Sequence, residues 1–300
     1  MALNNSKPFS TLNFNPHILN VEYAVRGLIP TRASEIALEL DVDHKWPFNE
    51  LTYLNLGNPQ NLGSKPITFG RQLISLCAYP PIIDLPGACS LFPEDVLIRA
   101  KSIISSITSF GGYTDSFGFE FVRREVANYI SYRDNCQADF RNIFLSDGAS
   151  KIIFNIISCI AKVQDDIPSG ILIPIPQYPL YTACLSYFGI VPIPYFLDED
   201  NDWGLSMDEL QEALVLNQGK SIPRAMVVIN PGNPTGQCLP FHMQVEILKF
   251  CNEQRLLLLA DEVYQDNLHD DAVKWFSFKN VYSSIQVLIY VKYLPTLFLM

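Results

Sequence analysis

Three side chains that follow two predicted strands have the types needed to hold a planar cofactor. Asn233 lies in the run from Asn230 to Gly236, Asn-Pro-Gly-Asn-Pro-Thr-Gly, and Asp261 and Tyr264 lie about one helix further along, in Asp-Glu-Val-Tyr. A buried carboxylate beside a pyridine nitrogen keeps that nitrogen protonated, which makes the ring an electron sink. An amide and a phenol can both hydrogen-bond a ring oxygen. These residues therefore predict a site for a cofactor that has a pyridine nitrogen and a phenolic oxygen.

The residues before both motifs predict the strands that would position them. Residues 225–229 and 256–260 are continuous apolar runs, which is typical of parallel strands buried on both faces of a sheet. In an open α/β sheet, ligands bind outside the carboxyl ends of the strands. Both motifs are therefore predicted to face the same ligand.

The rest of the chain predicts an alternation of strands and helices. Further strands are expected at 142–146, 170–176 and 191–196, and helices at 118–133, 207–216 and 241–254. Ser206 and Glu209 have the spacing of a capping box for the helix at 207–216. The alternation from residue 142 to residue 264 indicates βαβ units and a mostly parallel sheet.

A phosphate-binding turn is predicted where Gly148 opens a helix. The first helical residues would be Ala149 and Ser150, and a helix N-terminus offers unpaired amides and positive dipole to an anion. A hydroxyl at this position also suits a phosphate. The alternative interpretation is a plain capped helix without a ligand.

Composition excludes several classes of function. The 300 residues are 48% hydrophobic and 17% charged, and the formal net charge is −10, which indicates a globular chain without a general affinity for nucleic acid or anionic membrane. The seven cysteines are scattered without Cys-x-x-Cys spacing, so reduced thiols in an intracellular protein and no zinc site are expected. The N-terminal residues lack the apolar segment of a secretory signal.

Longer stretches carry a resemblance to a known family. The chain resembles the class I/II pyridoxal-phosphate-dependent aminotransferases, and within them the alanine aminotransferase subfamily together with the similar glutamate:glyoxylate aminotransferases. The stretches that carry the resemblance are Tyr23-Ala-Val-Arg-Gly, Lys65-Pro-Ile-Thr-Phe, Phe92-Pro-Glu-Asp-Val, Pro174-Ile-Pro-Gln-Tyr-Pro-Leu-Tyr and Asp261-Glu-Val-Tyr-Gln-Asp-Asn. The resemblance covers roughly residues 20 to 280.

The resemblance implies an architecture. The expected fold is α/β, the aminotransferase fold type I, with a mostly parallel sheet in the large domain and an incomplete small domain. The implied division is an N-terminal arm and part of the small domain at 1–90, a cofactor-binding large domain at 91–280, and a divergent tail at 281–300. No metal is implied.

The resemblance also assigns roles around pyridoxal 5′-phosphate. It implies that Asn233 and Tyr264 bond the ring oxygen, that Asp261 bonds the ring nitrogen, and that the ring of Tyr178 stacks on the cofactor. A flat aromatic face suits offset stacking on a pyridine plane.

Four more residues have implied roles toward the phosphate and the substrate. Ala149 and Ser150 would hold the cofactor phosphate, and Tyr113 would reach the phosphate of the neighbouring subunit in a homodimer. Gly57 would offer its backbone amide to the substrate carboxylate.

The implied reaction transfers an amino group between L-alanine and 2-oxoglutarate, giving pyruvate and L-glutamate. Glutamate:glyoxylate transamination is an open alternative, because nothing in the sequence separates pyruvate from glyoxylate as the 2-oxo acid. Carbon–sulfur lyases and aminocyclopropane-carboxylate synthases share the Asn-Pro-x-Asn-Pro motif, but the stretch from Pro176 to Tyr181 favours the alanine group. The compartment is open between cytoplasm, peroxisome and mitochondrion.

The C-terminal part departs from the family. Transamination needs a lysine amine that forms a Schiff base and moves a proton, and the Ser-x-Ser-Lys type stretch that would carry it is absent. Lys292 has a suitable spacing from Asp261 but its context matches nothing, so no catalytic residue is identified. We expect a C-terminally truncated chain with little activity, and the alternative is a non-catalytic fragment. The tail is too short and too interrupted to be a membrane anchor.

Overall fold

The computed structural model describes residues 15–42, 45–54, 57–60, 62–107, 109–288 and 296–299. The chain forms two compact units that interleave along the sequence. The first contains Met1–Leu51, Tyr132–Cys136 and Ser146–Met300, and the second contains Thr52–Ser131 and Gln137–Leu145. The predicted division at residues 90 and 280 stays a prediction.

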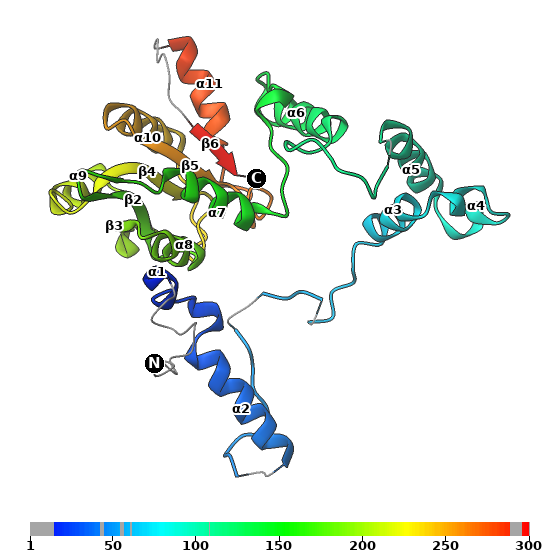
Figure 1. The fold of residues 1–300 in the computed structure, drawn as a ribbon, viewed down its shortest axis with the longest axis horizontal. Helices are drawn as coiled ribbons and strands as arrows, with labels where there is room; N and C mark the ends of the chain where they lie inside the picture. Colours follow the sequence, from blue (N-terminus) through cyan, green and yellow to red (C-terminus); the bar gives the residue numbers. More distant parts are fainter. Residues whose placement is uncertain are drawn as a thin grey trace, which may run out of the picture. The chain divides into compact units, whose positions relative to one another are not determined.

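A mostly parallel sheet lies at the centre of the first unit (Figure 1). Its strands are β1 (Val163–Gln164), β2 (Ile167–Ile175), β3 (Val191–Phe196), β4 (Ile222–Ile229), β5 (Leu257–Asp261) and β6 (Thr296–Leu299). β2 pairs in parallel with β3 and β4, β4 with β5, and β5 with β6, while β1 pairs antiparallel with β2. The predicted α/β class with a mostly parallel sheet is confirmed.

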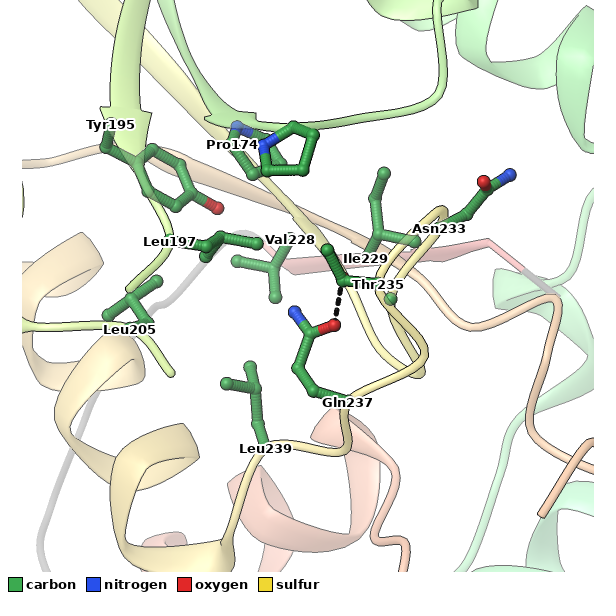
Figure 2. A pocket seen from close by; sticks show the side chains of 12 residues that line it. Pro174, Tyr195, Leu197, Leu205, Val228, Ile229, Asn233, Thr235, Gln237 and Leu239 are labelled. Atoms are coloured by element: carbon green, nitrogen blue, oxygen red, sulfur yellow. Dashed lines mark hydrogen bonds between the residues drawn. The ribbon is translucent and has the colours of Figure 1, made fainter. Parts of the chain in front are cut away.

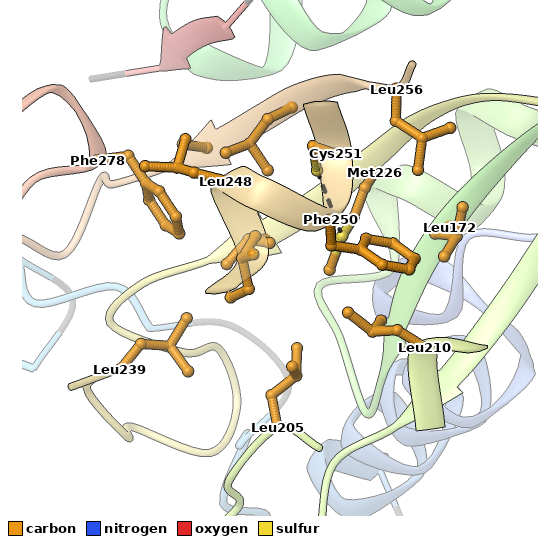
Figure 3. Packing of buried hydrophobic residues seen from close by; sticks show 14 of the residues in the cluster. Leu172, Leu205, Leu210, Met226, Leu239, Leu248, Phe250, Cys251, Leu256 and Phe278 are labelled. Atoms are coloured by element: carbon orange, nitrogen blue, oxygen red, sulfur yellow. Dashed lines mark hydrogen bonds between the residues drawn. The ribbon is translucent and has the colours of Figure 1, made fainter. Parts of the chain in front are cut away.

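Helices cover both faces of this sheet (Figure 1). The first unit contains α1 (Pro16–Leu19), η2 (Ala24–Arg26), α2 (Leu28–Val42), α7 (Ala149–Ile160), α8 (Leu180–Phe188), η5 (Glu199–Asn201), α9 (Met207–Leu216), α10 (Phe241–Glu253) and α11 (Phe278–Leu288). Residues such as Ile171 and Val227 pack with α7 and α8. Their neighbours Leu172 and Met226 pack with α9, α10 and α11 (Figure 3). This alternation makes each strand apolar on both faces, as expected for a buried parallel sheet.

The second unit is helical in the residues that the structure describes. It contains α3 (Thr68–Ala78), η3 (Pro80–Asp84), α4 (Ala88–Leu91), α5 (Glu94–Ser106), most of α6 (Glu120–Asp134) and η4 (Phe140–Asn142). Its core contains Leu76 from α3 and Val96 and Ala100 from α5.

Two local predictions are wrong for identifiable reasons. The strand expected at 142–146 does not form; Leu145 instead donates its backbone N–H to Phe117 O at 2.9 Å, so this segment pairs with the loop before α6. The capping box also fails, because the Ser206 side chain makes no capping hydrogen bond. The Glu209 carboxylate accepts the Phe196 backbone N–H at 2.8 Å instead. By contrast, β3 and α9 have the predicted bounds.

Candidate active site

The carboxyl ends of β4 and β5 bring the two principal motifs together. Ile229 pairs with Asp261 in the parallel ladder, and the Asn230 backbone N–H donates to Asp261 O at 2.9 Å. Beyond these strand ends, Asn233 Nδ2 donates to Tyr264 Oη at 3.3 Å. The amide and the phenol predicted to share one ligand oxygen are thus in direct contact.

Asp261 supplies the buried carboxyl group of this site, and the residue is only 4% exposed. Its Oδ2 accepts the hydroxyl of Tyr181 at 2.7 Å, and its Oδ1 accepts the Val263 backbone N–H at 3.4 Å. Burial raises the pKa of the Asp261 carboxyl, and these two hydrogen bonds oppose the rise. Both donors are neutral, so they do not balance the charge of an ionised carboxylate. A cationic group bound beside it would do so and would lower its pKa.

Tyr178 lies between β2 and α8, and the N-terminal segment reaches it. The hydroxyl oxygens of Tyr23 and Tyr178 are 3.0 Å apart. Burial, followed by the hydrogen bond with Tyr178, raises the pKa of Tyr23 to about 12. Ser186 of α8 also donates its hydroxyl to Asn20 O at 3.2 Å. The segment that carries Tyr23 is therefore held against α8.

The start of α7 has the form expected of an anion-binding turn. Ala149 and Ser150 are its first two residues, and Ser150 is exposed. The preceding N-cap residue is Gly148 at φ 91°, ψ 169°, which has no side chain to occupy the first-turn amides. The helix start can therefore offer two backbone N–H groups and one hydroxyl to an anion.

A small cavity of about 10 Å³ lies beneath the Asn233 loop. Figure 2 shows Asn233 at its rim and the amide of Gln237 within it, hydrogen-bonded to the Thr235 hydroxyl. Gly232 lies against this pair, because a Cβ added there would overlap the Gln237 amide and would lie 2.6 Å from Thr235 Oγ1. An added side chain at residue 232 would therefore displace the amide end of Gln237, which is a flexible side chain, and break its hydrogen bond with Thr235.

We expect Gly232→Ala to lower the free energy of unfolding by about 1 kcal/mol, since the added methyl group displaces the Gln237 amide and breaks its hydrogen bond with Thr235. Chemical denaturation of the chain measures this value. The matched background is Gln237→Ala, which removes most of the overlapping side chain and should reduce the cost of Gly232→Ala. Equal costs in both backgrounds would contradict the packing argument.

Three other predicted positions stay predictions. Gly57 and Tyr113 belong to the second unit, where Gly57 is exposed and Tyr113 is fully exposed. Lys292 lies outside the described residues. In the described part of the chain, no helix is long and apolar enough to cross a membrane.

Two residues of the site had no predicted role. Tyr181 is part of the stretch that carries the family resemblance, and it is the second residue of α8. Tyr23 was likewise part of a quoted stretch. Membership of these stretches marked both tyrosines as candidates for the site. Their roles could not be predicted, because their partners Asp261 and Tyr178 are distant in sequence.

Comparison with known proteins identifies relatives over most of the chain. A family model described as aminotransferase class I and II matches residues 85–290. Glutamate–glyoxylate aminotransferase 2 of Arabidopsis thaliana is 44% identical over 271 residues, which are 90% of this chain and 54% of that protein. Alanine aminotransferase 1 of Bos taurus is 43% identical over 272 residues, again 90% of this chain and 54% of the relative. The chain thus spans about half the length of the curated relatives it matches.

Solved structures have the same fold. An aminotransferase from Escherichia coli aligns with a TM-score of 0.68 at 23% identity, covering 91% of this chain and 56% of the other. An alanine aminotransferase from Pyrococcus furiosus aligns with a TM-score of 0.65 at 20% identity, covering 89% and 56%. At these identities the likeness concerns the fold alone.

Proposed function

This chain belongs to the class I and II aminotransferase family, and from that premise we propose that its site holds pyridoxal 5′-phosphate for transamination of L-alanine with 2-oxoglutarate. The products would be pyruvate and L-glutamate. The observation that carries the proposal is the set formed by Asp261, Asn233 and Tyr264 at the adjoining ends of β4 and β5.

The donor set fits this cofactor. When bound, pyridoxal phosphate supplies an aldehyde that takes up an amino group and a protonated ring that accepts electrons. Asp261 is a buried carboxylate that receives hydrogen bonds from neutral groups, so it suits a cationic ring nitrogen. The Asn233 amide and the Tyr264 phenol touch each other and suit one ring oxygen.

Other residues of the first unit complete the proposed binding. The amides of Ala149 and Ser150 with the Ser150 hydroxyl would bind the phosphate group. Tyr178 would stack on the ring, and its hydroxyl contact with Tyr23 restrains that ring. Tyr181 would act by holding the Asp261 carboxylate in one orientation.

The second unit enters the proposal through two residues. Gly57 would bind the substrate carboxylate through its amide, and Tyr113 would contact the cofactor phosphate of a second copy in a homodimer. The full exposure of Tyr113 is compatible with a contact made outside its own chain.

Glyoxylate is the second candidate acceptor. Relatives named for alanine and for glutamate–glyoxylate transamination have nearly the same identity to this chain, 43% and 44%. In the second reaction, glutamate would be the amino donor and glycine a product.

Saturable pyridoxal phosphate binding, followed by amino-acid-dependent turnover, tests the proposal. We expect the purified chain to bind the cofactor with a change in its absorption spectrum. With alanine and 2-oxoglutarate present, little or no pyruvate should form, because no catalytic lysine is identified, and any turnover in a parallel assay with glutamate and glyoxylate would identify the preferred acceptor. Borohydride reduction and peptide mass spectrometry would then locate any pyridoxyl-lysine and test Lys292.

The outcomes separate the candidates. Saturable binding without turnover of either substrate pair would support a non-catalytic, cofactor-binding chain. The absence of saturable binding would overturn the proposal.

A further inference from the structure

Asn230 connects three segments around the proposed site. The residue is fully buried. Its backbone N–H donates to Asp261 O at 2.9 Å, its Oδ1 accepts the Leu239 N–H at 3.0 Å, and its carbonyl accepts the indole N–H of Trp275 at 3.0 Å. The loop that carries Asn233 is therefore closed at both ends by one residue, and Trp275 is the side chain that holds it from outside.

Trp275 is in turn held by Arg133, near the end of α6. The Arg133 guanidinium carbon lies 5.2 Å from the centroid of the Trp275 ring. The same guanidinium makes two 2.7 Å hydrogen bonds to the Asp134 carboxylate. Asn280 of α11 donates to Asp134 O at 2.7 Å. This fixed, planar cation packs well against an aromatic face.

Arg133 also reaches the second half of the site. Its Nη1 donates to Gln265 Oε1 at 2.6 Å, and Gln265 follows Tyr264 directly in the chain. One guanidinium thus contacts the side chain that holds the Asn230 loop and the residue beside Tyr264. Its side chain is only 12% exposed, so water competes little for these contacts.

We propose that Arg133 and Trp275 are positioning residues that set the contact between Asn233 and Tyr264. With Asn230 they form a brace: Arg133 fixes Trp275, Trp275 fixes Asn230, and Asn230 fixes the Asn233 loop. The contact of Arg133 with Gln265 fixes the Tyr264 side of the same pair. The inference rests on the proposed function, because it assigns the pair to one oxygen of the bound cofactor.

Trp275→Phe is the direct test, because it keeps an aromatic ring for Arg133 but removes the N–H donor to Asn230. We expect pyridoxal phosphate to bind about tenfold more weakly, as for one lost hydrogen bond to a buried carbonyl. The absorption maximum of the saturated complex should also shift, since the contacts to the ring oxygen change. The matched control is Trp46→Phe, which removes an indole donor that bonds Glu39 at 3.0 Å outside the site, and it should change neither quantity.

Arg133→Lys tests the order of action within the brace. Lysine keeps the positive charge but loses the two-pronged contact with Asp134. If Arg133 acts partly through Trp275, this substitution should weaken cofactor binding more in the wild-type background than in Trp275→Phe. Equal weakening of cofactor binding in the two backgrounds would contradict the step from Arg133 to Trp275 and leave only the contact of Arg133 with Gln265.

Amide hydrogen exchange of the cofactor-free chain separates failure of the brace from failure of the proposed function. Trp275→Phe should accelerate exchange in residues 231–238 and 263–267 and leave β2 and β3 unchanged, while Trp46→Phe should alter neither loop. Unchanged exchange in both loops would overturn the inference, as would wild-type affinity and spectrum in a folded Trp275→Phe chain. Wild-type protein that binds no cofactor would overturn the proposed function and leave the exchange result to decide on the brace.

Discussion

Replacement of Asp261 by asparagine is expected to weaken pyridoxal phosphate binding about a hundredfold, because it removes the charge opposite the ring nitrogen while keeping the side-chain shape. The carboxylate is 4% exposed, so little water screens it. Fluorescence or absorption titration of the two proteins measures the ratio of their dissociation constants.

The matched control is Asp266→Asn, which removes the same charge from an exposed loop residue five positions along the chain. It should bind the cofactor like the wild type. Equal weakening by both substitutions would mean that general electrostatics, not a contact with Asp261, attracts the cofactor. If Asp261→Asn binds pyridoxal phosphate as tightly as the wild type, the proposed contact between Asp261 and the ring nitrogen is wrong.

The central strands could be predicted because each one is a continuous apolar run in the sequence. The apolar runs that end at Ile229 and near Ala260 predict β4 and β5, and each run is buried on both faces. Parallel neighbours then place the residues after the strands at one edge. The two strand ends alone therefore predict that Asn233, Asp261 and Tyr264 follow the same edge of the sheet.

The connections between distant segments were not predictable in this way. Periodicity tells which side chains are buried, but not which partner each one meets. Thus it gave no sign that Tyr181 would donate to Asp261 or that Trp275 would hold Asn230. The failed strand at 142–146 has the same origin, because the backbone N–H of Leu145 bonds Phe117 O in a loop and not a strand of the sheet.

A second large effect is expected from pH acting on Glu262, a fully buried residue next to Asp261. Burial raises the pKa of its carboxyl to about 8 from an ordinary value of 4.5, and the N–H of Phe278, which donates to Oε1 at 2.7 Å, opposes the rise. Arg133 also lowers this pKa, whereas Asp134 and Asp261 raise it.

The direction of the stability change follows from these values. Between pH 4.5 and about 8 the folded chain keeps a proton on Glu262 that the unfolded chain releases. The free energy of unfolding should therefore fall as the pH rises through this window, by up to about 1.4 kcal/mol per pH unit, and level off above it. Asp261 adds to the fall with the same sign, since burial raises its pKa too.

Glu262→Gln should remove the part of this slope that Glu262 causes, because glutamine carries no proton to lose. Chemical denaturation from pH 5 to pH 9 measures the slope, and the variant should gain most, relative to the wild type, at the alkaline end. Glu246→Gln is the control, because Glu246 is an exposed residue of α10. An unchanged slope in Glu262→Gln would show that Glu262 is already charged in the folded chain.

The pH effect bears on the site because Glu262 and Asp261 are buried neighbours. The two side chains contact different elements, Tyr181 of α8 and Phe278 of α11, but the charge of Asp261 still helps to raise the pKa of Glu262. Asp261 receives the Tyr181 hydroxyl and the Val263 N–H, whereas Glu262 receives the Phe278 N–H. A proton kept on Glu262 therefore removes one charge that would oppose ionisation of Asp261, at the strand end where a protonated ring nitrogen would bind. Loss of the slope in Glu262→Gln, together with loss of cofactor affinity in Asp261→Asn, would establish that division of roles.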